Sequence, residues 1–362
     1  MALMAHVASS GLAQAEDADH PQVWIELGGQ LARLQDGHET FAPSVMDGRP
    51  SGFDPSQMFE KPPRYGFDGV GALTVQPEGS KWVFTASAQY GRSKSNKYHL
   101  QQTNPEPFPK YFTGVRVPAR DAIPIAQRFA ETTARDVEQH VILDFKVGRD
   151  VGLGLFKGVE GTSTISAGVR FAQFGSKTNI SLKSDPDWHF VTKYNPIVHG
   201  IVTNGQPFHS NLASMYAERS FHGVGPALSW QASAPLIGNE RDGAILADVG
   251  FNAAVLFGRQ KAQTHHQTTV RSFPAGRIAG AAVPHTVSRF PNTPDHARAR
   301  SITVPNIGGF AGLSMKYPNA KVSFGYRADF FFGAMDGGID TRKTYDVGFH
   351  GPYASVSIGL GG

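Results

Sequence analysis

Apolar and polar residues alternate along most of the chain, in segments that polar connections separate. In the segment 81–94, for example, Phe84 and Ala86 alternate with Thr85 and Ser87. Successive side chains on a β-strand point to opposite faces, so this period of two predicts strands with one apolar and one polar face. The pattern predicts ten strands, over residues 22–34, 65–76, 81–94, 137–153, 163–177, 218–233, 244–260, 301–317, 321–334 and 348–360.

The predicted strands are long and their connections are uneven. Most strands have 12 or more residues, whereas strands of soluble proteins average about five or six and a membrane-spanning strand needs about 9–11. Short and long connections alternate, which is typical of outer-membrane barrels. We therefore expect an all-β fold, a closed antiparallel transmembrane β-barrel with its long loops on one side. The long connections are 35–64, 95–136, 178–217, 261–300 and 335–347, and the short ones are 77–80, 154–162, 234–243 and 318–320.

The long connections leave room for further structure. Two more strands within 95–136 or 178–217 would raise the expected number from ten to twelve, and residues 122–137 are compatible with one short helix. The competing fold is a soluble antiparallel sheet with one buried and one solvated face. That fold explains neither the length of the strands nor the asymmetry of the connections.

Charged residues fall on one face of the predicted strands. The apolar faces carry no charge through their centres, which matters because a lipid-facing Arg or Lys at the bilayer midplane costs about 2–4 kcal/mol. The charged positions have the opposite parity and are expected to line the lumen, where charges set the selectivity of a pore. These candidate lumen-lining residues are Glu26, Asp68, Glu138, Asp144, Lys146, Arg170, Asp248, Arg327 and Asp329.

Composition narrows the function classes. Charged residues make up 18% of the 362 residues, and Gly (41) and Pro (24) are frequent, which argues against a disordered chain or a coiled coil. A net charge of +4 is too weak to indicate a nucleic-acid partner. The absence of cysteine excludes disulfides, thiolate catalysis and Cys-ligated zinc. We expect no cofactor, because the sequence has no phosphate-binding loop, and it has no nucleophile-elbow motif either. We expect no metal, because the neighbouring His265 and His266 would point to opposite faces of a strand.

The N-terminus has features of a secretory signal. Residues 1–15 are mildly apolar and end in Ala13-Gln14-Ala15, a small-residue cleavage pattern, although the usual basic start is missing. We expect residues 1–15 to be a removed segment and residues 16–362 to form a single barrel domain.

Three segments resemble a known family. His350-Gly351-Pro352-Tyr353 leads into the last alternating strand, Phe324–Asp329 precedes it, and Ile142–Phe145 and Val169–Gln173 form a predicted hairpin. Comparable segments occur in the Legionella-type pore-forming outer-membrane proteins, often labelled major-outer-membrane-protein-like. The resemblance implies a porin-like barrel in the outer membrane of a Gram-negative bacterium.

Three functions remain open at this point. The first is a porin for passive diffusion of small solutes, although ten strands predict a narrow or plugged lumen. The second is a non-conducting structural or adhesin barrel. The third is a hydrolase at the rim, in which His189 or His266, near acidic side chains, would act as general base. Of the three functions we do not expect this one, and we expect that the protein is not an enzyme. Expected partners are outer-membrane lipid, the barrel-assembly machinery, small solutes, a second copy of the chain, and lipopolysaccharide on Arg271, Arg277, Arg289, Arg298 and Arg300.

Overall fold

The described residues cover the predicted strands almost completely, together with parts of the connections. In the described part of the chain, no helix is both long and apolar enough to cross a bilayer. The computed structural model describes residues 22–35, 64–94, 98–103, 111–112, 115–116, 129–151, 161–185, 190–195, 200–205, 208–239, 243–273, 276–277, 286–289, 296–339 and 341–360.

Ten antiparallel strands form a closed barrel. Each strand pairs with the next along the chain, and the ring closes where β1 pairs with β17 from Val23↔Leu360 to Gln35↔Gly348. The predicted fold class and the number of strands are therefore confirmed. The barrel strands are β1 (Gln22–Gln35), β2 (Arg64–Gln76), β3 (Trp82–Lys94), β7 (Phe129–Asp150), β8 (Thr162–Asp185), β11 (Phe208–Asn239), β12 (Gly243–Phe273), β15 (His296–Tyr317), β16 (Ala320–Asp336) and β17 (Thr344–Leu360).

Short strands in the long connections stay outside the ring. β4 (Tyr98–Thr103) pairs with β7 and β14 (Thr286–Arg289) pairs with β12, so the twelve-strand alternative is wrong for the barrel itself. The expected helix over 122–137 is also wrong where it can be checked, because β7 already begins at Phe129 and pairs with both β4 and β8; residues 122–128 lie outside the described residues. The other short strands are β5 (Tyr111–Phe112), β6 (Val115–Arg116), β9 (Phe190–Asn195), β10 (Gly200–Gly205) and β13 (Gly276–Arg277).

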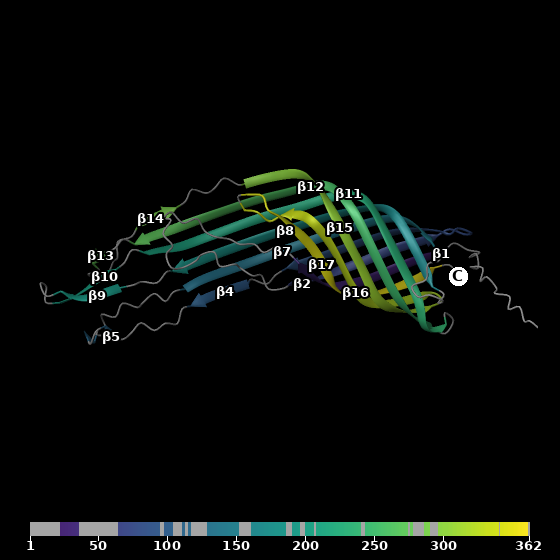
Figure 1. Cartoon of the computed structure of the whole chain (residues 1–362), viewed down its shortest axis with the longest axis horizontal. Helices are drawn as coiled ribbons and strands as arrows, with labels where there is room; N and C mark the ends of the chain where they lie inside the picture. Colours follow the sequence, from purple (N-terminus) through teal and green to yellow (C-terminus); the bar gives the residue numbers. More distant parts are fainter. Residues whose placement is uncertain are drawn as a thin grey trace, which may run out of the picture.

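The barrel wall is much taller on one side. β1, β2 and β3 have 13 or 14 residues, whereas β11 has 32 and β12 has 31. At about 3.3 Å per residue, a 32-residue strand is on the order of 100 Å long, far more than a bilayer core of about 30 Å requires. Figure 1 shows the longer strands continuing, at the left of the view, past the ends of β16 and β17. We call this part of the wall the extension.

The outward face of the ring is an uncharged apolar band. Leu27, Phe67 and Leu228 are each more than 60% exposed, as large apolar side chains rarely are in soluble proteins. On the described strands the band ends toward the extension at polar and basic outward positions such as Arg33 and Arg92. Further large apolar side chains that are exposed on the ring include Ile25, Leu31, Leu73, Phe84, Phe145, Val169, Phe251, Leu313, Phe324, Val356 and Ile358.

Above the band the outward face becomes polar. On β8 the outward positions change from Val169 and Phe171 to Gln173 and then Lys177. The exposed Lys177 Nζ lies 2.9 Å from Glu218 Oε1 of β11. Hydrogen bonds from Lys177 and Tyr216 lower the pKa of Glu218. These outward groups are solvated, so the extension stands in water and the apolar band below it does not.

Candidate functional site: the barrel interior

The centre of the interior is a charged cluster that joins opposite walls. Arg170 on β8 donates from Nε to Asp144 Oδ1 at 2.7 Å and from Nη2 to Asp144 Oδ2 at 2.8 Å, a two-pronged contact across the β7–β8 pair. The Nη1 atom of Arg170 donates to Asn252 on β12 at 2.7 Å and also to Asn306 on β15. Asp329 Oδ1 on β16 lies 3.8 Å from the same nitrogen. Since β8 and β15 are not neighbours in the ring, these contacts cross the lumen.

A second buried polar group lies between β2, β3 and β7. Asp68 Oδ2 is 3.1 Å from His140 Nε2 and accepts a hydrogen bond of 3.0 Å from Gln89 Nε2. Gly91 of β3 stands between the two strands, and a Cβ at this position would collide with both Asp68 and His140. Glycine here allows the close approach that the Asp68–His140 contact requires.

The end of the lumen near the short turns is polar as well. Asp248 Oδ2 on β12 lies 2.9 Å from Lys321 Nζ on β16, and Ser233 donates to Asp248. Arg327 stacks its guanidinium 5.1 Å from the ring centre of Tyr353 and 5.8 Å from that of Phe310. Such cation–π contacts stabilise a charge that water does not reach freely.

The structure separates the nine predicted lumen-lining residues into several groups. Asp144, Lys146, Arg170 and Asp329 come together in the central cluster, where Lys146 Nζ is 2.9 Å from Asp144 Oδ2. Asp68 pairs with His140, and Asp248 and Arg327 have the separate contacts given above. The remaining two are half-buried: Glu26 lies opposite Ser357, and Glu138 lines a cavity of about 30 Å³ beside His140 and Phe349.

An apolar layer covers the central cluster on the side of the extension. Phe174 lies four residues beyond Arg170 on β8, and its ring is 4.7 Å from that of Phe331 and 5.8 Å from those of Phe221 and Phe349. All four phenylalanines are at most 3% exposed. Sequence reasoning missed this layer, because it treated inward positions as polar. The sequence did contain an indication of it: Ala172 and Phe174 are apolar, and they lie on the same inward face of the strand as Arg170.

The segment after this layer on β16 turns into the barrel mouth. Pairing between β16 and β17 shifts between Phe331 and Met335, and Gly333 within the bulge has φ +65°. A positive φ favours glycine. Residues 333–339, which we call the mouth segment, then run against the inner face of the extension, where Ala334 and Met335 are at most 2% exposed.

Polar side chains of the long strands hold the mouth segment by its backbone. Gln260 Nε2 donates to Ala334 O at 3.1 Å, and Thr264 Oγ1 and Arg298 Nη1 each donate to Ile339 O at 2.8 Å. These donors lie on β12 and β15. The mouth segment therefore covers the end of the lumen on the side of the extension.

Asp336 provides the one ion pair found between the described part of the mouth segment and the wall. Its carboxylate is held by Arg298, with Nε–Oδ2 at 2.6 Å and Nη2–Oδ1 at 2.9 Å. Burial raises the pKa of Asp336, but the hydrogen bonds from Arg298 and from the backbone N–H groups of Gly338 and Lys343 outweigh it, so that its pKa lies below the ordinary 3.8. Arg298 holds Asp336, and Arg300 donates a hydrogen bond to Gln260, so both side chains face the inside of the barrel. The expectation that these two arginines reach lipopolysaccharide is therefore wrong.

The hydrolase alternative lies partly outside the described residues and stays a prediction. Within the described ranges, no three His, Asp or Glu side chains are grouped closely enough to hold a metal ion. His266 lies on β12 opposite Met215, and His189 is outside the described residues. The segment 1–15 also lies outside them.

The closed sheet and its uncharged outer band define a class of protein. In hydrocarbon every backbone N–H and C=O must be satisfied within the protein, which a closed ring of strands achieves. An apolar exterior around a polar interior, with short turns on one side, is the arrangement of an outer-membrane β-barrel. The chain is therefore an outer-membrane β-barrel of ten strands.

Comparisons with known proteins do not define a family. No protein-family model and no curated protein matches the chain, so membership of the Legionella-type pore-forming proteins stays a prediction. The transport unit of the autotransporter AIDA-I from Escherichia coli aligns with 6% identity and a TM-score of 0.18, covering 95% of this chain and 91% of that one. The TodX deltaS2S3 mutant monoaromatic hydrocarbon channel aligns with 9% identity and a TM-score of 0.20, covering 94% and 90%.

Outer-membrane expressed OmpT of Vibrio cholerae has 9% identity and a TM-score of 0.12, covering 93% of this chain and 98% of that one. Superpositions this loose carry no weight for the fold, which rests on the strand pairing and on the band of exposed apolar side chains.

Proposed function

We propose that the protein is a narrow, gated channel for passive diffusion of small solutes through the bacterial outer membrane. The observation that carries this proposal is the mouth segment. Residues 333–339 cover the outer end of a charged lumen and are held there by side-chain hydrogen bonds. Beyond the bulge this segment is tied to β17 by the pairs Met335↔Tyr345 and Asp336↔Thr344, so the mouth can open at the cost of these pairs while the rest of the ladder stays closed as a sheet.

The charged interior supports the same function. The central cluster has Arg170 between Asp144 and Asp329, and charges at the narrowest part of a pore set which ions pass. Once the mouth segment and the phenylalanine layer move aside, this cluster is the next constriction that a solute meets. Passive diffusion needs no catalytic group and no cofactor, and we propose neither.

One observation favours a second function, that of a non-conducting structural or adhesin barrel. Arg170 connects β8 with Asn252 on β12 and with Asn306 on β15, so the lumen is bridged as well as capped. Narrow barrels with filled interiors do not conduct. In that case the extension and its loops would carry the function at the cell surface.

Ion current through the purified protein in planar bilayers separates the two functions. The wild-type barrel should show rare, small openings. Arg298→Gln removes the ion pair to Asp336 and two backbone contacts of the mouth segment, and it should increase the open fraction about tenfold or more, since a charge-assisted pair contributes about 1.5–3 kcal/mol. Lys177→Gln, which changes an exposed pair outside the lumen, is the matched control and should behave like wild type.

Absence of current from both wild type and Arg298→Gln, in protein whose gel migration is heat-modifiable and therefore folded, would overturn the channel proposal. The structural or adhesin barrel would then be the better function.

A further inference from the structure

The outward wall of the barrel carries a groove of about 610 Å³ at the level where the apolar band ends. It crosses four neighbouring strands, β8, β11, β12 and β15. Two paired glycines, Gly223 and Gly258, form its floor. Both glycines lie at inward positions of their strands, where a Cβ would meet the ring of Phe221. The outward floor of the groove is therefore backbone between the outward pairs His222↔Arg259 and Val224↔Phe257.

The backbone ladder is interrupted next to this floor. The β11–β12 register runs to Val224↔Phe257 and resumes only at Ala227↔Ala254. Pro226 within the gap has no N–H to donate. The register is the same on both sides of the gap, so the two strands stay paired beside the groove.

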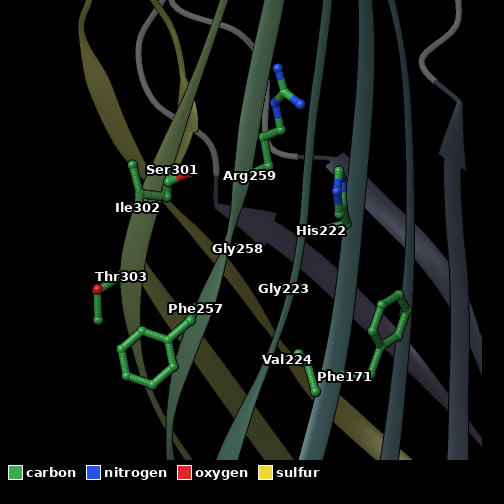
Figure 2. A pocket seen from close by; sticks show the side chains of 10 residues that line it. All are labelled: Phe171, His222, Gly223, Val224, Phe257, Gly258, Arg259, Ser301, Ile302 and Thr303. Carbon is green, nitrogen blue, oxygen red and sulfur yellow. The ribbon is translucent and has the colours of Figure 1, made fainter.

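The two halves of the groove differ in chemistry. Figure 2 shows His222 and Arg259 on one side of the glycine pair, and Phe171, Val224 and Phe257 on the other. The apolar half belongs to the band, with Phe257 58% and Val224 49% exposed. The polar half lies toward the extension and adds the hydroxyl of Ser301, which lies opposite Arg259, whereas Thr303 lies opposite Phe257 beside the apolar half. None of the ten lining residues is acidic.

We infer that this groove binds one lipid whose headgroup carries phosphate, with an acyl chain against the apolar half. A guanidinium binds phosphate with two parallel hydrogen bonds, and a hydroxyl or an imidazole adds further donors. The hydrocarbon of the bilayer meets Phe171 and Phe257, so an acyl chain that leaves the headgroup runs directly onto them. A volume of 610 Å³ lies within the usual range of about 300–1,000 Å³ for small-molecule sites.

Charge and position select this occupant over others. A free phosphate ion would use only the polar half of the groove. A second copy of the chain would have to present an acidic and apolar surface together, whereas the outward band of this barrel is uncharged. This inference rests on the proposed membrane location but not on conduction. A protein that binds no lipid would therefore contradict the inference alone, and a protein that carries no current would contradict the channel alone.

Native mass spectrometry of the full chain in a neutral maltoside detergent tests the site. Dioleoyl phosphatidic acid, titrated into the micelles, should give a predominant one-lipid complex, and dioleoylglycerol, which has the same chains without phosphate, should not. Arg259→Gln with His222→Gln should weaken the binding of phosphatidic acid about tenfold or more, because the charge-assisted hydrogen bonds are lost. Arg259→Lys should recover part of it.

Arg92→Gln is the matched control, since Arg92 is also an exposed outward residue near the end of the band but lies on β3, outside the groove. Equal loss in Arg92→Gln and in the double variant, or no loss in either, would overturn the inference, provided that each variant shows the heat-modifiable migration of a folded barrel. Displacement of the lipid by millimolar inorganic phosphate alone would overturn it too, because the acyl chain would then contribute nothing.

Discussion

Arg170 has the most connected side chain of the interior, with contacts to Asp144, Asn252, Asn306 and Asp329. It is 4% exposed. A buried charge is tolerated only when its hydrogen-bond capacity is used, and all three nitrogens of this guanidinium donate hydrogen bonds. Each partner comes from a different strand, so a single residue fixes how β7, β12, β15 and β16 lie around the lumen.

Replacing Arg170 should therefore weaken the whole barrel. We expect Arg170→Ala to lower the free energy of unfolding by about 3–5 kcal/mol, because the buried Asp144 loses its two-pronged contact and keeps Lys146, while the buried Asp329 loses its ion pair. Urea-induced unfolding in lipid vesicles measures this. Arg92→Ala removes an exposed outward arginine and should change stability by no more than about 0.5 kcal/mol. Equal effects of the two substitutions would contradict the role given to the central cluster.

Gly333 supports the mouth segment through its backbone conformation. Its φ of +65° is in the left-handed region, and a Cβ added to this residue would meet no atom within 4 Å, so the cost of substitution is conformational and not steric. We expect Gly333→Ala to destabilise the closed mouth by about 1–2 kcal/mol. Gly69→Ala, where space is equally open but φ is not positive, is the control. The open fraction in bilayers should rise for the first variant and stay unchanged for the second.

At the scale of elements, hydrogen bonds and one ion pair attach the mouth segment to β12 and β15. The ion pair contains a group that titrates, the carboxyl of Asp336. The pKa of Asp336 is lower in the closed mouth than its ordinary 3.8. A carboxyl with a lowered pKa stabilises the closed form at pH values above 3.8. That contribution is lost as the pH falls through the lowered value, so acid should release the segment.

A spin label at Arg342→Cys, an exposed position beside the mouth segment, reports this release, and the label is specific because the chain has no other cysteine. The label should become more mobile as the pH falls below about 3.8. In Asp336→Asn the mobility should already be high at neutral pH and should not change with acid. A label that stays equally immobile across the pH range in the parent protein would show that Asp336 does not hold the mouth.

At the scale of the whole molecule, the decisive feature is what the apolar band touches. Leu228 is 61% exposed on the outward face of β11. In water, replacing an exposed leucine by arginine is nearly neutral. In the middle of a bilayer the same change costs about 2–4 kcal/mol.

We therefore expect Leu228→Arg to lower the free energy of unfolding in lipid vesicles by about 2–4 kcal/mol. Gln173→Arg, at the outward edge of the band on β8, should cost no more than about 1 kcal/mol, because the penalty falls toward the interface. If both variants are as stable as the parent protein, the band does not face lipid and the membrane location is wrong.

The strand framework could be predicted because alternation is a local property. The side-chain period of a strand fixes which residues share a face, so Leu27 and Asp68 could be assigned to opposite faces before their neighbours were known. Strand ends were less predictable. β11 was expected from residue 218 and begins at Phe208, since beyond the band the outward face becomes polar and the contrast between the two faces fades.

The sequence by itself determined the ten strands, their alternating connections and the face on which each charge lies. Only the tertiary structure decided that Arg170 meets Asn306, that four phenylalanines meet above them, and that the connection after β16 turns inward. The physical reason is that alternation is fixed by the geometry of a single strand, whereas contacts across the lumen depend on the stagger between strands that are far apart in the chain. No local pattern encodes that stagger.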